Sequence, residues 1–218
     1  MPGREIRLAP RVLYYSYVFC AYATTTFFFV CECIILRETI KDPNKFVRQL
    51  AMMFTHLKGI MMLHTLVFNG NAIEKVMEAL QDEKYVYEAQ DEFQPGLMLR
   101  KARRVTCVLS VMAFVLYNFV GVSGHISSTI TLNGKAVGND LPANTTCYDF
   151  LPYYFYIPFD AGNKFRCQVA LVFMDVSLDV FAMVIATYDG VFLTLMNCLK
   201  TQLQIVQCAV RTLRERCI

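Results

Sequence analysis

Apolar residues gather into four long runs along this chain, and the last run is the longest. Residues 165–200 read FRCQVALVFMDVSLDVFAMVIATYDGVFLTLMNCLK, with only a few charged side chains among them. An α-helix rises about 1.5 Å per residue, so this run would reach roughly 50 Å, well beyond the ~30 Å hydrocarbon core of a bilayer. The pattern predicts a long helix over 165–199 that crosses a membrane and continues past it.

The polar side chains inside this run fall on one face of the predicted helix. With about 100° of rotation per residue, five of them lie within an arc of roughly 80°. These five, here called the polar seam, are Gln168, Asp175, Asp179, Asp189 and Asn197. Carboxylates at membrane depth are costly and usually face protein or a wet cavity, so the seam predicts a side that faces other helices. Alternatively, Asp189 and Asn197 lie beyond the membrane, and only Asp175 and Asp179 need a polar environment.

The three other apolar runs are also long enough to cross a membrane. We predict spanning helices over 12–36, 50–68 and 105–130. The first run is too long for a signal-peptide core and has no small-residue cleavage site after it, so we expect it to be retained. The second is interrupted by His56, Lys58 and His64, which makes it the weakest of the four predictions. The spacing of its two histidines suits buried or cavity-lining side chains better than shared metal coordination.

The basic residues of the connecting segments predict an orientation. Arg100-Lys101-Ala102-Arg103-Arg104 directly precedes the third run, and such a cluster beside a spanning helix usually stays cytoplasmic. Taken alone, the cluster would also suit anionic lipid or nucleic acid, but its position favours an anchor. With the amino terminus inside, thirteen Lys and Arg lie in the inside segments 1–11, 69–104 and 200–218. The outside segments 37–49 and 131–164, together with Arg166, hold seven. This asymmetry places both termini in the cytoplasm.

Turn signals and helical spacing mark the connecting segments. Asp42-Pro43 indicates a turn within 37–49, and Gln94-Pro95-Gly96 indicates a break within 69–104. Helical spacing within 69–104 is seen at Ile73, Val76, Met77 and Leu80. The segment 131–164 carries Asn144-Thr145-Thr146, a glycosylation acceptor that requires an extracellular or lumenal side.

The nine cysteines are dispersed, and most lie inside apolar runs. Cys147 and Cys167 share the outer compartment in the predicted orientation, where a disulfide would persist, and the sequence leaves open whether they form one. Cys31 and Cys33 are separated by one residue and lack the spacing and partner ligands of a zinc site.

Composition narrows the class of protein. Hydrophobic residues make up 56% of the chain and charged residues 18%, against usual values of about 45–50% and 25%. The net charge of +3 is too small to indicate nucleic-acid binding. No catalytic motif is found, and no His or Cys on the face of Asp175, Asp179 and Asp189 completes a metal site. We therefore expect an all-α integral membrane protein with a four-helix bundle, no catalytic activity, no metal and no cofactor.

Three groups of residues resemble one family of membrane receptors. They are 54–59 (FTHLKG) with 71–80 (NAIEKVMEAL), 151–154 (LPYY) with 156–159 (YIPF), and 188–192 (YDGVF) with 199–204 (LKTQLQ). In these stretches, and diffusely over most of its length, the chain resembles the amino-terminal half of an insect odorant receptor. The resemblance implies a seven-helix fold with a cytoplasmic amino terminus and a long fourth helix that projects into the cytoplasm.

The same resemblance implies that this chain is the truncated part of a longer receptor. Family members continue through three further helices, including the pore-lining seventh, which have no counterpart here. A truncated gene model, a partial clone, a short isoform or a pseudogene product would each explain the difference. A chain of this kind is not expected to conduct ions by itself.

The function implied is recognition of volatile apolar odorants within a ligand-gated cation channel, in the plasma membrane of olfactory sensory neurons. The implied partners are the odorant co-receptor and the small volatile ligand. The residues at the depth of the family's pocket are Tyr117, Asn118, Ser123, Met174 and Leu178. Ordinary packing between helices is the alternative role for each. A gustatory receptor of the same superfamily and a four-span scaffold protein are the alternative functions, although a scaffold of the tetraspanin kind would need a cysteine-rich outer loop.

Overall fold

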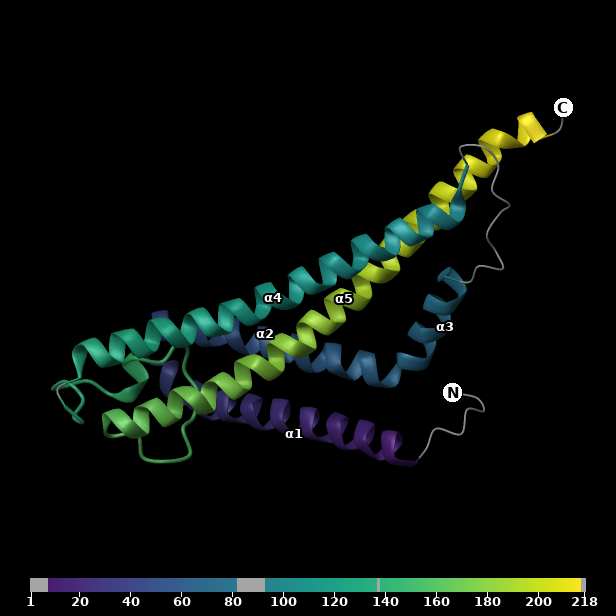
Figure 1. Ribbon diagram of the computed structural model, residues 1–218. Coiled ribbons are helices and arrows are strands. Elements are labelled where there is room, and N and C mark those ends of the chain that lie inside the picture. The colour runs from purple at the N-terminus through teal and green to yellow at the C-terminus, as the bar shows by residue number, and fades with distance from the viewer. Residues whose placement is uncertain (1–7, 82–92, 137, 217–218) are drawn as a thin grey trace. The chain divides into compact units, whose positions relative to one another are not determined.

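The computed structural model describes residues 8–81, 93–136 and 138–216, and their regular structure is helical (Figure 1). The elements are α1 (Leu8–Thr39), α2 (Pro43–Phe68), α3 (Gly70–Gln81), α4 (Pro95–Lys135), the short 3₁₀ helix η2 (Cys147–Asp149) and α5 (Lys164–Arg216). By length and composition, α1, α2, α4 and α5 are each able to cross a membrane. The prediction of an all-helical protein with four long apolar helices is confirmed.

Helix α2 begins at Pro43, seven residues before the predicted start at 50. The carboxylate of Asp42 accepts hydrogen bonds from the backbone N–H groups of Asn44 at 3.0 Å and Lys45 at 3.4 Å. These bonds satisfy amides that the first helical turn leaves unpaired, and proline suits that turn because its missing N–H would have no partner there. The dipeptide Asp42-Pro43 therefore starts a helix, and the predicted connection over 37–49 shrinks to 40–42.

The third and fourth spans are also longer than predicted. Helix α4 begins at Pro95, so the basic cluster of residues 100–104 lies inside a helix and not in a loop. Helix α5 runs for 53 residues, about 80 Å at the standard rise, so most of the segment predicted as a tail, 200–218, is helical. The predicted segment 1–11 and the last two residues lie largely outside the described residues.

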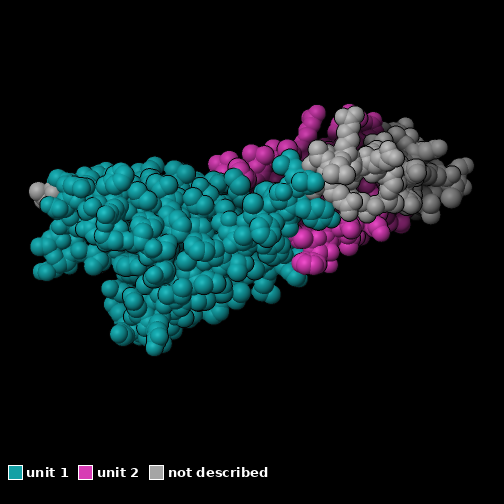
Figure 2. Space-filling view, turned by 90° about the horizontal axis from the view of Figure 1, so that it is seen from below, with its two compact units in different colours: residues 1–64, 116–185 teal, residues 65–115, 186–218 magenta. Residues whose placement is uncertain are grey.

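The chain divides into two compact units, shown in Figure 2. Unit 1 comprises residues 1–64 and 116–185, and unit 2 comprises residues 65–115 and 186–218. Helices α2, α4 and α5 contribute to both.

In unit 1, the segment between α4 and α5 contributes to the hydrophobic core. Tyr153, Phe155 and Ile157 are buried and alternate with more exposed neighbours, as expected for an extended strand-like segment. The backbone N–H of Tyr156 donates to the carbonyl of Cys31 at 3.1 Å, which fixes this segment against α1. The segment between α4 and α5 is therefore a packed part of the unit.

In unit 2, α3 is fastened to α5 near its carboxyl end. The amide of Gln202 donates to the carbonyl of Leu80 at 2.7 Å. The amide of Gln81 donates to the sulfur of Cys198 at 3.7 Å. A small apolar core lies further along α5, formed by Phe93, Ile205 and Ala209 with Met98, Leu99 and Cys208 packed against it.

Candidate functional site

In unit 1, the polar seam of α5 lies against α4. The amide of Gln168 donates to Asn133 Oδ1 at 3.5 Å. Asp175 forms an ion pair with His125. A Cβ added to Gly121 would lie 3.7 Å from a carboxylate oxygen of Asp179, so the small residue leaves space beside that side chain. In this series of contacts the residue numbers decrease along α4 while they increase along α5, so these portions of the two helices are antiparallel.

In unit 2, the seam contacts α4 through Asn197. Its amide donates to the carbonyl of Ala102 at 2.9 Å and to Thr106 Oγ1 at 2.8 Å. The second bond joins two side chains, and Thr106 is itself buried. Asp189 lies on the same helix and is partly buried. A polar contact between α4 and α5 is therefore present in each unit.

The ion pair between His125 and Asp175 was missed by reasoning about one helix at a time. No His or Cys of α5 lies on the face of Asp175, yet α4 supplies His125 from across the helix pair. The side chains remain 36% and 22% exposed, so this face of unit 1 is polar and accessible. Among the described residues no group of three or more His, Cys, Asp or Glu side chains is placed to hold a metal ion.

A second pair, Glu32 with His56, joins α1 to α2 inside unit 1. Its side chains are 0% and 2% exposed, so neither reaches water. The His56 ring stacks on Phe181 of α5 with centroids 3.9 Å apart, and it makes a T-shaped contact with the Tyr153 ring, with centroids 5.7 Å apart. Gly59 makes this stack possible, because a Cβ there would lie 2.8 Å from Phe181 Cδ1. One polar pair is thus flanked by aromatic rings from two other parts of the chain.

The segment between α4 and α5 reaches the pair of Glu32 and His56 through Tyr153. Its hydroxyl donates to Ser177 Oγ at 3.3 Å. Burial raises the pKa of the Tyr153 hydroxyl above its usual range, and the hydrogen bond with Ser177 lowers it by a smaller amount. Tyr153 therefore stays protonated and acts as a donor. Only His56 in the second apolar run and Glu32, the single charge of the first, could have indicated this contact from the sequence.

The five residues predicted for the ligand pocket do not share one surface. Met174 is fully buried in the core, and Leu178 packs against that core. Ser123 is exposed, and its hydroxyl donates to the carbonyl of Val120 at 2.9 Å. Tyr117 is 36% exposed and Asn118 is partly buried. Met174 and Leu178 thus contribute to the packing of unit 1, and the ligand-binding role of the five residues stays a prediction.

Both features that were predicted for an outer compartment lie in the segment between α4 and α5 or in the first turn of α5. Cys147 and Cys167 form a disulfide that ties the segment to the first turn of α5. Asn144 is exposed at a turn, with a φ of 60° that asparagine tolerates better than most residues. The glycosylation acceptor Asn144 therefore lies on the surface.

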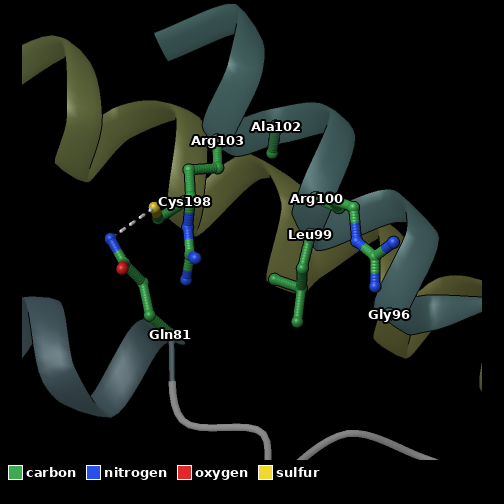
Figure 3. A pocket seen from close by; sticks show the side chains of 7 residues that line it. All are labelled: Gln81, Gly96, Leu99, Arg100, Ala102, Arg103 and Cys198. Carbon is green, nitrogen blue, oxygen red and sulfur yellow. Dashed lines mark hydrogen bonds between the residues drawn. The ribbon is translucent and has the colours of Figure 1, made fainter. Parts of the chain in front are cut away.

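A cavity of about 380 Å³ lies in unit 2, at the end of α3 (Figure 3). Its described lining residues are Gln81, Gly96, Leu99, Arg100, Ala102, Arg103 and Cys198. Two of these are cationic and none is acidic. The sequence cluster at 100–104 thus contributes two of its arginines to a concave site.

Comparison with protein-family models, with curated proteins and with solved structures gives no match.

Proposed function

We propose that this chain is a chemoreceptor subunit of the insect odorant-receptor kind, which binds volatile apolar ligands within a ligand-gated cation channel. The observation that carries the proposal is the length of α5. It is one helix of 53 residues, of which a membrane accounts for only about 20. A spanning helix that projects far beyond the bilayer is the feature that the resemblance implies for the fourth helix of that family.

The orientation proposed is an amino terminus in the cytoplasm and residues 136–163 outside the cell. The excess of basic residues in the segments assigned to the inside supports it. The disulfide between Cys147 and Cys167 and the exposed acceptor Asn144 agree with an outer compartment.

Ligand recognition is proposed for the outer part of the bundle, in unit 1. Volatile odorants bind by burying apolar surface, with a few polar groups that orient them. Unit 1 offers aromatic rings, such as the neighbouring Phe28 and Phe173, and a small polar layer around His56. For gating, the ligand must bind more tightly to one channel state than to the other, which requires the pore-forming partner. That partner is proposed to be the odorant co-receptor, in the plasma membrane of olfactory sensory neurons.

The test is whether the full chain associates specifically with the odorant co-receptor. The tagged chain would be expressed in insect cells with the co-receptor, with a gustatory receptor subunit, or with a tetraspanin, and purified in mild detergent. We expect the co-receptor alone to be retained, and volatile ligands to raise the Tm of the complex but not that of the co-receptor by itself. Retention of the gustatory subunit alone would favour the gustatory alternative, and retention of none of the three would refute the proposal.

A further inference from the structure

The cavity at the end of α3 combines two arginines with a lining in which no described residue is acidic. We propose that it binds a phosphate group of an anionic ligand, and that the ligand is the phosphorylated headgroup of a membrane lipid. Such a site would act independently of odorant recognition, because it lies in unit 2 and uses none of the residues assigned to the odorant.

The shape of the cavity follows from small residues between large ones. Gly96 and Ala102 contribute little bulk, and a Cβ added to Gly96 would meet nothing within 4 Å. Arg100 and Arg103 are three residues apart on α4, so they project from neighbouring positions of one helix face. Figure 3 shows Arg103 extending from α4 toward the side on which Gln81 of α3 lies.

The lining offers donors and few acceptors. Each guanidinium presents several N–H groups in a planar fork that matches a phosphate bidentately. The Gln81 amide has two N–H groups, and its hydrogen bond to Cys198 uses one of them. The volume of about 380 Å³ is at the lower end of the range of small-molecule sites, which suits a headgroup better than a large ligand.

The charges of the cluster are not compensated by described carboxylates. Arg100, Lys101, Arg103 and Arg104 lie within five residues, and none of them makes an ion pair with a described residue. Four like charges held close together on one helix repel one another, and an anion bound among them relieves that repulsion. This group of cationic side chains suits a ligand with more than one negative charge.

The position of the cavity favours a lipid over a soluble phosphate. The apolar stretch of α4 begins at Val105, directly after the cluster, so the arginines lie where a spanning helix meets the headgroup layer. Helix α3 has apolar residues at helical spacing, yet none of its residues is buried. An amphipathic helix whose apolar side chains stay partly exposed suits the membrane interface. The cavity thus lies between an interfacial helix and the start of a span.

Binding can be measured on the full chain purified in neutral detergent. The probes are dioctanoyl phosphatidylinositol 4,5-bisphosphate, the free headgroup inositol 1,4,5-trisphosphate, and dioctanoyl phosphatidylcholine. The test variant is Arg100→Gln with Arg103→Gln, which removes both lining cations. The matched control is Lys101→Gln with Arg104→Gln, which removes the same charge from the same turns of α4 but leaves the cavity lining intact.

We expect the bisphosphate lipid to bind wild type, and phosphatidylcholine not to bind. The lining variant should lose affinity about tenfold or more, because two charge-assisted contacts disappear, while the control variant loses about threefold or less. All four substituted side chains are exposed, so helicity and Tm should stay at wild-type values and exclude unfolding as the cause.

Three outcomes would overturn the proposal. Equal losses in the two variants would show that general surface charge, and not the cavity, holds the lipid. Binding of the free headgroup as tightly as the lipid, with the same variant dependence, would retain the phosphate site but refute the lipid as its ligand. Failure of wild type to bind either phosphorylated probe would refute the site itself.

Discussion

At the scale of single residues, the carboxylate of Glu32 and the imidazole of His56 meet where neither side chain reaches water. Isolated charges in such a place are strongly unfavourable, so each side chain is tolerated because of the other. The pair joins α1 to α2, and the ring of Phe181 brings α5 to the same point. One polar contact therefore helps to fix the relative positions of three helices in unit 1.

Removing one partner of this pair should destabilise the protein more than replacing both. Glu32→Ala leaves His56 buried without its partner, and the expected loss in the free energy of unfolding is about 3–5 kcal/mol. Glu32→Met combined with His56→Phe keeps the volume and the stack on Phe181, and should cost clearly less. Thermal unfolding of the purified chain gives the comparison. A double variant that loses as much as Glu32→Met and His56→Phe added together would show that the pair contributes no coupling.

The close approach at Gly59 leads to a second prediction at this scale. Gly59→Ala places a methyl group 2.8 Å from Phe181 Cδ1, so the ring must move, and the expected loss is about 1–3 kcal/mol. Gly70→Ala is the matched control, because a Cβ there meets nothing within 4 Å and α3 gains a better helix former. The two Tm values, measured side by side, check this expectation. Equal Tm values would mean that Phe181 repacks without cost.

At the scale of elements, the presence of the long helices was predictable, but their ends and their contacts were not. A run of apolar residues is a local property, so it identifies a span directly from the sequence. The start of α2 depends on one side chain, Asp42, which also fits a turn. The pairing of His125 with Asp175 depends on which helices are neighbours and on their register. Neither can be deduced from the sequence of one segment alone. The same holds for the cavity, which exists only because the end of α3 lies beside α4 and α5.

The cap of α2 can be tested by itself. Asp42→Ala removes the acceptor for the N–H groups of Asn44 and Lys45, and should lower the free energy of unfolding by about 1 kcal/mol. Faster amide hydrogen exchange should be confined to the first turn of α2, because only that turn loses its cap. Asn44→Ala, which leaves the Asp42 carboxylate in place, is the control. Unchanged exchange at residues 44 and 45 in Asp42→Ala would show that the cap does not hold the helix end.

At the scale of the whole molecule, the proposed orientation requires that one segment experiences the extracellular environment. The disulfide between Cys147 and Cys167 and the acceptor Asn144 lie in that same outer region, so they report on one compartment. The basic cluster before Val105 is expected on the opposite, cytoplasmic side of the membrane. These two regions can lie on opposite sides only if the chain crosses the membrane an odd number of times between them. Helix α4, which joins them, supplies one crossing.

Glycosylation at Asn144 is the prediction that tests this arrangement. Wild type expressed in insect cells should migrate faster in gel electrophoresis after glycosidase treatment, while Asn144→Gln and Thr146→Ala should run at the treated position from the start. Thr145→Ala keeps the acceptor triplet, because its middle position accepts any residue except proline, and should behave as wild type. If wild type shows no shift in cells that glycosylate a secreted control, residues 136–163 do not face the lumen. The chain would then have the reverse orientation, against the charge asymmetry, with the arginines of the unit 2 cavity on the extracellular side.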